Sequence, residues 1–184
     1  MYDSGTVFTA FDTETTSLSP LTGCIIEIGA VKFNKNGVIK TFSELFKPPV
    51  SVPQEITDLT GITNEMLCNK DPISKHLPDF LEMIKGTVLV AHNAQFDLNF
   101  LNSECMSCKL PVTDNDVIDT LQFARFAYQD FEKHKLPILA EKLGIDPGKS
   151  HRATDDAETC RQLLIKMFEK TRPASDENQL DLFG

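Results

Sequence analysis

The sequence lacks an apolar run long enough to cross a bilayer, and its N-terminus lacks the basic flank and apolar core of a secretion signal. We therefore expect a soluble, cytoplasmic protein with no membrane partner. Its 5 cysteines are odd in number and scattered, which argues against the paired framework of a secreted disulfide-rich domain. Cys105 and Cys108 form a Cys-x-x-Cys pair, but no second pair follows at a zinc-ribbon spacing.

Basic residues are also few: 18 Lys and Arg stand against 27 Asp and Glu, for a net charge of -9. This balance excludes a large, purely electrostatic nucleic-acid footprint, because polyanion binders usually display a basic face. It still allows an enzyme that holds only a few nucleotides and uses bound metal ions as its local positive charge.

With 184 residues, 41% of them hydrophobic, the chain is long enough for one buried domain and too short for two ordinary ones. We expect a domain over 1–171 and a flexible tail over 172–184, which begins with a polar segment containing Pro173.

Apolar and β-branched runs predict five strands. The first three follow one another as an antiparallel meander, and the later strands alternate with helices, which predicts an α/β fold with a mixed sheet. The expected strands cover 6–12, 24–33, 38–46, 87–91 and 117–118. Helices are expected as two short pieces around Gly61, over 73–84, after His92, over 120–128 and 136–143, and after 150.

Asp12 and Glu14 are the first candidate site. Residues i and i+2 of a strand point to the same face, so the two carboxylates lie side by side at the end of the first strand. Adjacent anions repel unless a cation lies between them, which favours a divalent metal site. A solvated strand end, or carboxylates that cap the following turn, would explain the pair equally simply.

Two further polar clusters follow at strand or loop ends, one from His92 to Asp97 and one from His151 to Asp156. Active sites of open α/β sheets lie where such connections converge. Carboxylates that converge there need cations, and oxygen ligands with few nitrogens or sulfurs select Mg2+ or Mn2+ over Zn2+.

The three clusters read, in order, Asp-x-Glu, His-Asn-x-x-Phe-Asp and His-x-Ala-x-x-Asp. This series resembles the exonuclease motifs of the DEDD superfamily in its histidine branch, and within it the proofreading (epsilon) subunits of bacterial DNA polymerase III. Three ordered motifs are far more specific than any one of them. The resemblance implies a ribonuclease H-like fold.

The resemblance also implies roles for residues. Asp12, Glu14, Asp97 and Asp156 would be the metal-binding carboxylates for two Mg2+ ions, with Mn2+ as a substitute, and His151 the general base. The family spacing selects Asp156 over its neighbour Asp155. Histidine titrates near neutral pH, at about 6.5 when unperturbed, and can accept the proton of an attacking water. An exposed loop histidine is the alternative.

Substrate contacts are implied more loosely. By analogy, Thr15, Thr16, Leu18, Gly61 and Ile62 would cradle the terminal nucleotide, and a core or loop role is the alternative for each. His92 would either contact substrate or orient its neighbours.

The tail ends in the segment Gln179-Leu180-Asp181-Leu182-Phe183, which resembles the pentapeptide by which bacterial replication proteins bind the sliding clamp. Short apolar anchors in a flexible chain often dock into a hydrophobic groove. The alternative is that Leu182 and Phe183 fold back on their own domain. A clamp would raise the local concentration of the enzyme near DNA.

The sequence thus predicts a metal-dependent 3'-5' exonuclease that releases nucleoside 5'-monophosphates from single-stranded or frayed DNA 3' ends, in replication proofreading or in repair. A DNA polymerase is a possible partner. Two alternatives stay open: an exoribonuclease that trims RNA 3' ends, and a catalytically silent adaptor docked on the clamp. The intact motifs argue against the second.

Overall fold

A computed structural model describes residues 5–148 and 151–171 of the chain. Its sheet has five strands in the order β3-β2-β1-β4-β5. The β1-β2 and β2-β3 pairs are antiparallel, and the β1-β4 and β4-β5 pairs are parallel. These pairings confirm the mixed α/β sheet with an antiparallel start. The strands are β1 (Phe8–Thr15), β2 (Ile25–Asn34), β3 (Gly37–Leu45), β4 (Val88–Ala91) and β5 (Val117–Asp119).

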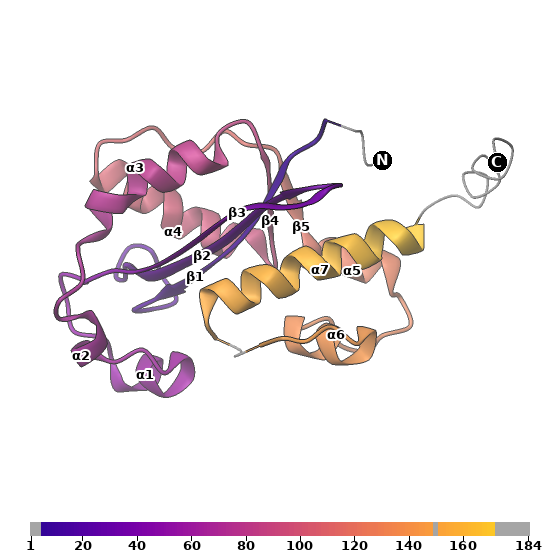
Figure 1. Ribbon diagram of the computed structural model, residues 1–184. Helices are drawn as coiled ribbons and strands as arrows, with labels where there is room; N and C mark the ends of the chain where they lie inside the picture. Colours follow the sequence, from indigo (N-terminus) through magenta and orange to yellow (C-terminus); the bar gives the residue numbers. More distant parts are fainter. Residues whose placement is uncertain (1–4, 149–150, 172–184) are drawn as a thin grey trace, which may run out of the picture.

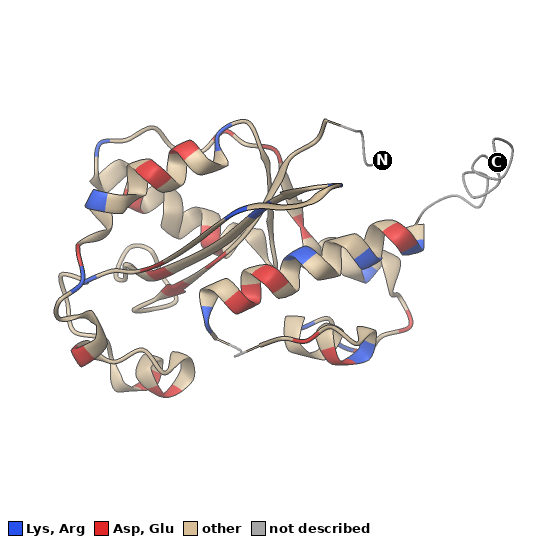
Figure 2. Ribbon diagram, viewed as in Figure 1, with Lys and Arg blue, Asp and Glu red and all other residues tan. Residues whose placement is uncertain are grey.

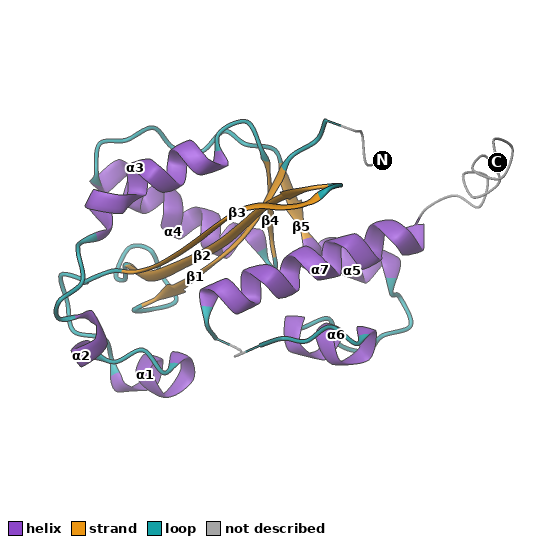
Figure 3. Cartoon of the chain, viewed as in Figure 1, coloured by secondary structure: helices purple, strands orange, loops and turns teal. Residues whose placement is uncertain are grey.

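Helices cover both faces of this sheet, as Figures 1 and 3 show. They are α1 (Gln54–Thr60), α2 (Asn64–Leu67), α3 (Ile73–Ile84), α4 (Ala94–Ser107), α5 (Thr120–Ala127), α6 (Leu136–Leu143) and α7 (Ala153–Thr171). None of the described helices is both long and apolar enough to cross a membrane. All five cysteines, including Cys105 and Cys108, are free.

Alternation along β1 divides the core in two. Phe11 packs with α3 and α4 on one face, whereas Phe8 and Ala10 pack with α5, α6 and α7 on the other. Because strand side chains alternate, Asp12 and Glu14 continue the face of Phe8 and Ala10. The acidic pair therefore faces the α7 side of the sheet.

The strand carrying this pair is longer than the sequence indicated. β1 runs through Thr15, and Glu14 pairs with Glu27 of β2 before the register shifts between Glu14 and Thr15. The intervening threonines are β-branched and suit an extended, half-buried strand. Both acids are therefore held by sheet pairing and do not lie in the turn that follows.

Gly29 of β2 allows α7 to approach the sheet closely. It is the β2 partner of Asp12, and a Cβ built on it would lie 2.1 Å from backbone atoms of Ala153 and Thr154. Because real Cβ atoms do not approach so near, any larger residue would push away the start of α7.

We therefore expect Gly29→Ala to destabilise the protein by about 1–3 kcal/mol or more, the usual cost of overpacking. Thermal unfolding would measure the loss. Gly5→Ala is the matched control, because nothing lies within 4 Å of its Cβ position. Equal melting temperatures for the two variants would contradict the close packing of α7 on β2.

Candidate active site

The first motif lies where two parallel strands end together. β1 and β4 are neighbours in the sheet and run in the same direction, so their carboxyl ends share an edge. Asp12 is partly exposed there, and Glu14 is 9% exposed. The second motif follows β4 directly and is thereby delivered to the acidic pair.

Asp97 comes from the first turn of α4 and is buried. The helix begins after Asn93, whose left-handed backbone, with φ 67°, turns the chain out of β4. Thr13 donates two hydrogen bonds to Asp97 Oδ1, from its amide (2.9 Å) and from its hydroxyl (2.7 Å). The residue between the two acids of the first motif thus fixes the acid of the second.

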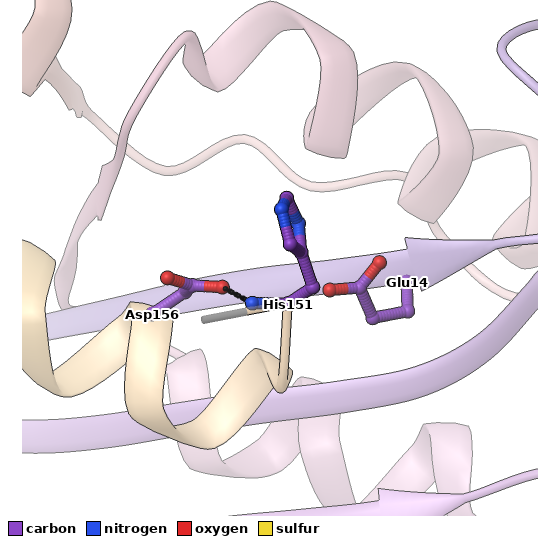
Figure 4. Close-up of side chains that lie close together, drawn as sticks. All are labelled: Glu14, His151 and Asp156. Carbon is purple, nitrogen blue, oxygen red and sulfur yellow. Dashed lines mark hydrogen bonds between the residues drawn. The ribbon is translucent and has the colours of Figure 1, made fainter. Parts of the chain in front are cut away.

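His151 and Asp156 lie at the start of α7. His151 is exposed and has a left-handed backbone with φ 62°. Its amide donates a 2.8 Å hydrogen bond to Asp156 Oδ2. Potential ligand atoms of Glu14, His151 and Asp156 all lie within 4.8 Å of one another, and Figure 4 shows the two carboxylates on either side of His151. Asp155 shares the first turn of α7, where its charge suits the helix dipole.

A buried ion pair anchors this third motif to the sheet. Glu27, only 1% exposed, accepts hydrogen bonds from Arg152 Nη2 (2.8 Å) and Nε (3.2 Å) and from the amide of Ala153 (3.1 Å). Such a charge-assisted, two-pronged contact fixes orientation as well as distance. Sequence reasoning missed Glu27 and Arg152; the available signal was a lone acid inside an otherwise apolar strand.

Burial, with neighbouring carboxylates in second place, dominates the electrostatics of the site, and Figure 2 shows acidic residues, in red, in the first turns of α7. Burial, followed by the charges of Asp97, Glu14 and Asp156, raises the pKa of Asp12 well above its usual range. Burial and then Asp156 raise the pKa of Glu14 to about 8. Burial raises the pKa of Asp97 to about 7 against the opposing bonds from Thr13. Burial also raises the pKa of Asp156.

His92 belongs to the framework of the site. Its Nε2 lies 2.8 Å from the carbonyl oxygen of His134, and its Nδ1 lies 3.0 Å from the Thr120 hydroxyl. Burial lowers its pKa and so favours the neutral ring, and Nε2 donates to the carbonyl oxygen of His134. Both ring nitrogens have partners within the fold, and His92 also lines the cleft described below, so its role, contacting substrate or orienting its neighbours, stays a prediction.

Side chains at the end of β1 and just after it form hydrogen bonds within the same segment. Thr15 donates its hydroxyl hydrogen to the carbonyl of Ser17 (2.6 Å), and the Thr16 hydroxyl accepts from the amide of Cys24 (3.0 Å). Leu18, by contrast, is 82% exposed. Of these three residues, only Leu18 has a side chain open to a ligand.

Gly61 ends α1 in a left-handed conformation, with φ 70°. Ile62 is fully buried in a small cluster with Ile26, Val52, Ile56 and Leu67, and its amide and carbonyl are bonded to threonine hydroxyls. The structure therefore gives Ile62 a packing role. The tail residues Gln179, Leu180, Leu182 and Phe183 lie outside the described residues.

A cleft of about 640 Å³ opens beside the acidic cluster. Asp12, His151 and Asp156 line it together with residues of α5, of α6 and of the segment between these helices. Its volume lies in the range of pockets that bind small molecules. Acids gathered with a histidine at the end of an α/β sheet are the arrangement that a hydrolytic site with divalent metals would need.

Comparison with known proteins agrees with this class. The model of the family described as Exonuclease (RNase_T) matches residues 9–164, and the chain belongs to this family. The resemblance noted from the motifs is confirmed.

Two relatives illustrate the match. The chain is 43% identical over 163 residues to the DNA polymerase III subunit epsilon of Treponema pallidum, covering 88% of this chain and 76% of that protein. It is 44% identical over 163 residues to a PolC-type DNA polymerase III of Caldanaerobacter subterraneus, covering 89% of this chain but only 12% of the polymerase.

Solved structures show the same fold. Exonuclease X in complex with 5' overhanging duplex DNA has a TM-score of 0.71 and 25% identity, covering 89% of this chain and 92% of that one. The nuclease domain of 3'hExo, a DEDDh family member bound to rAMP, has a TM-score of 0.76 and 22% identity, covering 90% and 92%.

The raised carboxyl pKa values predict that the metal-free protein loses stability as pH rises. Groups whose folded pKa is raised stabilise the fold while protonated and cease to do so above their folded pKa. With chelator present, the melting temperature should fall between about pH 5 and about pH 9, as Asp97 and Glu14 ionise near pH 7 and 8.

Mn2+ or Mg2+ should restore stability most at the alkaline end, where the carboxylates are charged and bind cations best. Glu14→Gln should flatten the profile. A melting temperature independent of both pH and metal would contradict the description of the site as a cluster of repelling acids.

Proposed function

We propose that the chain is a metal-dependent 3'-5' exonuclease that releases nucleoside 5'-monophosphates from DNA ends. The observation that carries this proposal is the convergence of Asp12, Glu14, Asp97 and Asp156 with His151, from three distant parts of the sequence. The assigned domain is 1–171, with the tail 172–184 as a separate partner-binding segment.

The residues fit divalent cations. Each of the four acids has a raised pKa, first through burial, so a nearby positive charge would favour their ionised forms. An all-oxygen set with one nearby histidine suits two Mg2+ or Mn2+ ions. When bound, these ions would supply the positive charge that stabilises the anion formed as a phosphodiester is attacked.

The protein side of the reaction follows from His151. Its exposed ring is free to accept the proton of an attacking water, while its backbone amide is tied to Asp156. The Glu27–Arg152 pair holds the turn from which His151 projects. A general base must be placed within hydrogen-bond reach of its proton, and this anchoring supplies the placement.

DNA is the favoured substrate because the two relatives described above are named as a DNA polymerase III subunit and a DNA polymerase III. By the same reasoning a DNA polymerase is a candidate partner, with proofreading or repair as the role. By the family analogy, the exposed side chain of Leu18 would contact the terminal base. Backbone groups around Thr15, Thr16 and Gly61 are candidate contacts, whereas the side chain of Ile62 would support the turn.

Degradation of strands labelled at the 5' end tests the activity. With Mg2+ we expect a ladder of shortened products, release of 5'-monophosphates and no activity with chelator. His151→Ala should lower kcat by about 10²–10⁴-fold, the usual contribution of a general base. His76→Ala is the matched control, because His76 pairs with Asp71 instead of a member of the acidic cluster.

Matched RNA strands serve as the second substrate. Faster trimming of RNA than of DNA would overturn the substrate assignment, and no turnover with either metal would leave the adaptor function as the better account. Loss of only a 3' label, with the 5' label kept on long products, establishes the polarity.

We also propose that the tail binds the sliding clamp through Gln179, Leu180, Leu182 and Phe183, because the segment is short, apolar and follows a polar linker. Deleting 179–183 should abolish clamp binding in a pull-down or titration and leave hydrolysis of short oligonucleotides nearly unchanged. Clamp binding that survives the deletion would refute this assignment.

A further inference from the structure

The wall that α5, α6 and the segment between them contribute to the cleft carries two cations. Arg125 of α5 and Lys135, which precedes α6, are the arginine and lysine side chains among the described residues that line it. Both are exposed, and neither makes an ion pair within the described part of the chain. In a chain with a net charge of -9, two basic side chains without an ion-pair partner stand out beside a site that would cleave phosphodiesters.

The fold holds this wall rigidly against the active site. His92 contacts Thr120, the first residue of α5, and the carbonyl of His134, which immediately precedes Lys135. Asp119 caps α5 through the amide of Leu121 and also accepts from the amide of Asn93. One motif residue thereby positions both segments from which the cations project.

The orientation of Arg125 is consistent with this placement. Leu121 and Arg125 are one turn apart on α5 and both line the cleft, so one face of the helix forms the wall. Among the charges that act on His92, Arg125 opposes its protonation, which places the guanidinium near the second motif.

We propose that Arg125 and Lys135 bind the phosphodiester backbone of the substrate strand, on the 5' side of the bond that is cut. The proposal rests on the exonuclease function proposed above. The phosphate under attack belongs at the acidic cluster, where metal ions would neutralise it. The next phosphates along the strand need partners outside that cluster, and Arg and Lys are the usual ones.

Two substrates distinguish binding of the upstream phosphates from a role at the phosphate that is attacked. A single-stranded oligonucleotide has phosphates upstream of the cut, whereas the p-nitrophenyl ester of thymidine 5'-monophosphate has only the phosphate that is attacked. Arg125→Gln and Lys135→Gln should each lower kcat/KM on the oligonucleotide by about tenfold, as expected for one charge-assisted hydrogen bond. Hydrolysis of the ester should be unchanged.

Lys133→Gln is the matched control, because Lys133 is an exposed neighbour that does not line the cleft. Glu132 lines the same wall, so Glu132→Gln should strengthen oligonucleotide use by removing a repelling charge. Equal losses of activity on both substrates would place Arg125 and Lys135 at the attacked phosphate. A loss in Lys133→Gln alone would show that Arg125 and Lys135 do not bind the strand. Either result overturns the proposal.

Fluorescence anisotropy of a labelled oligonucleotide, with chelator present, measures binding without hydrolysis. It tests the inference even if no hydrolysis is found. Each of the two variants should reduce the slope of log affinity against log salt by about 0.7 for one phosphate contact to a single strand. Unchanged slopes would overturn the cationic site. Absent hydrolysis with reduced slopes would instead refute the proposed function and leave the binding site standing.

Discussion

The burial and crowding of four carboxylates is the constraint on which this candidate active site depends. Sheet pairing fixes Asp12 and Glu14 on one strand, and the fold adds Asp97 and Asp156 from two helices. Any one of these acids alone would be ordinary at the end of a strand. Burial raises the pKa of all four, and the neighbouring acids raise those of Asp12 and Glu14 further. Cations bound among the four carboxylates would relieve this cost.

The rest of the framework holds these acids in place against their repulsion. Thr13 neutralises part of the cost at Asp97 with two hydrogen bonds, and the Glu27–Arg152 pair fastens the start of α7 to β2. Gly29 allows the close approach that this pair requires. Each supporting contact lies beside a motif residue. These contacts are made by strands and helix ends, which are more rigid than long loops.

Much of this was accessible from the sequence. The ordered motifs predicted the family. The mixed sheet was predicted separately, because apolar runs and turn residues mark strands directly. Glu27, Arg152 and Thr13 were missed because their importance lies in contacts between segments, which one sequence does not reveal. The expected first strand ended at residue 12, whereas sheet pairing extends β1 to Thr15. The buried position of Ile62 depended on tertiary packing, with no local signal beyond its hydrophobicity.

The most direct test of the account is anomalous X-ray scattering from crystals grown with Mn2+ and a thymidine monophosphate product at alkaline pH. The account predicts two manganese peaks that contact Asp12, with Glu14, Asp97 and Asp156 completing their ligands. Manganese bound elsewhere, or no peak beside these carboxylates, would contradict the claim that the acidic cluster is the metal centre of an exonuclease.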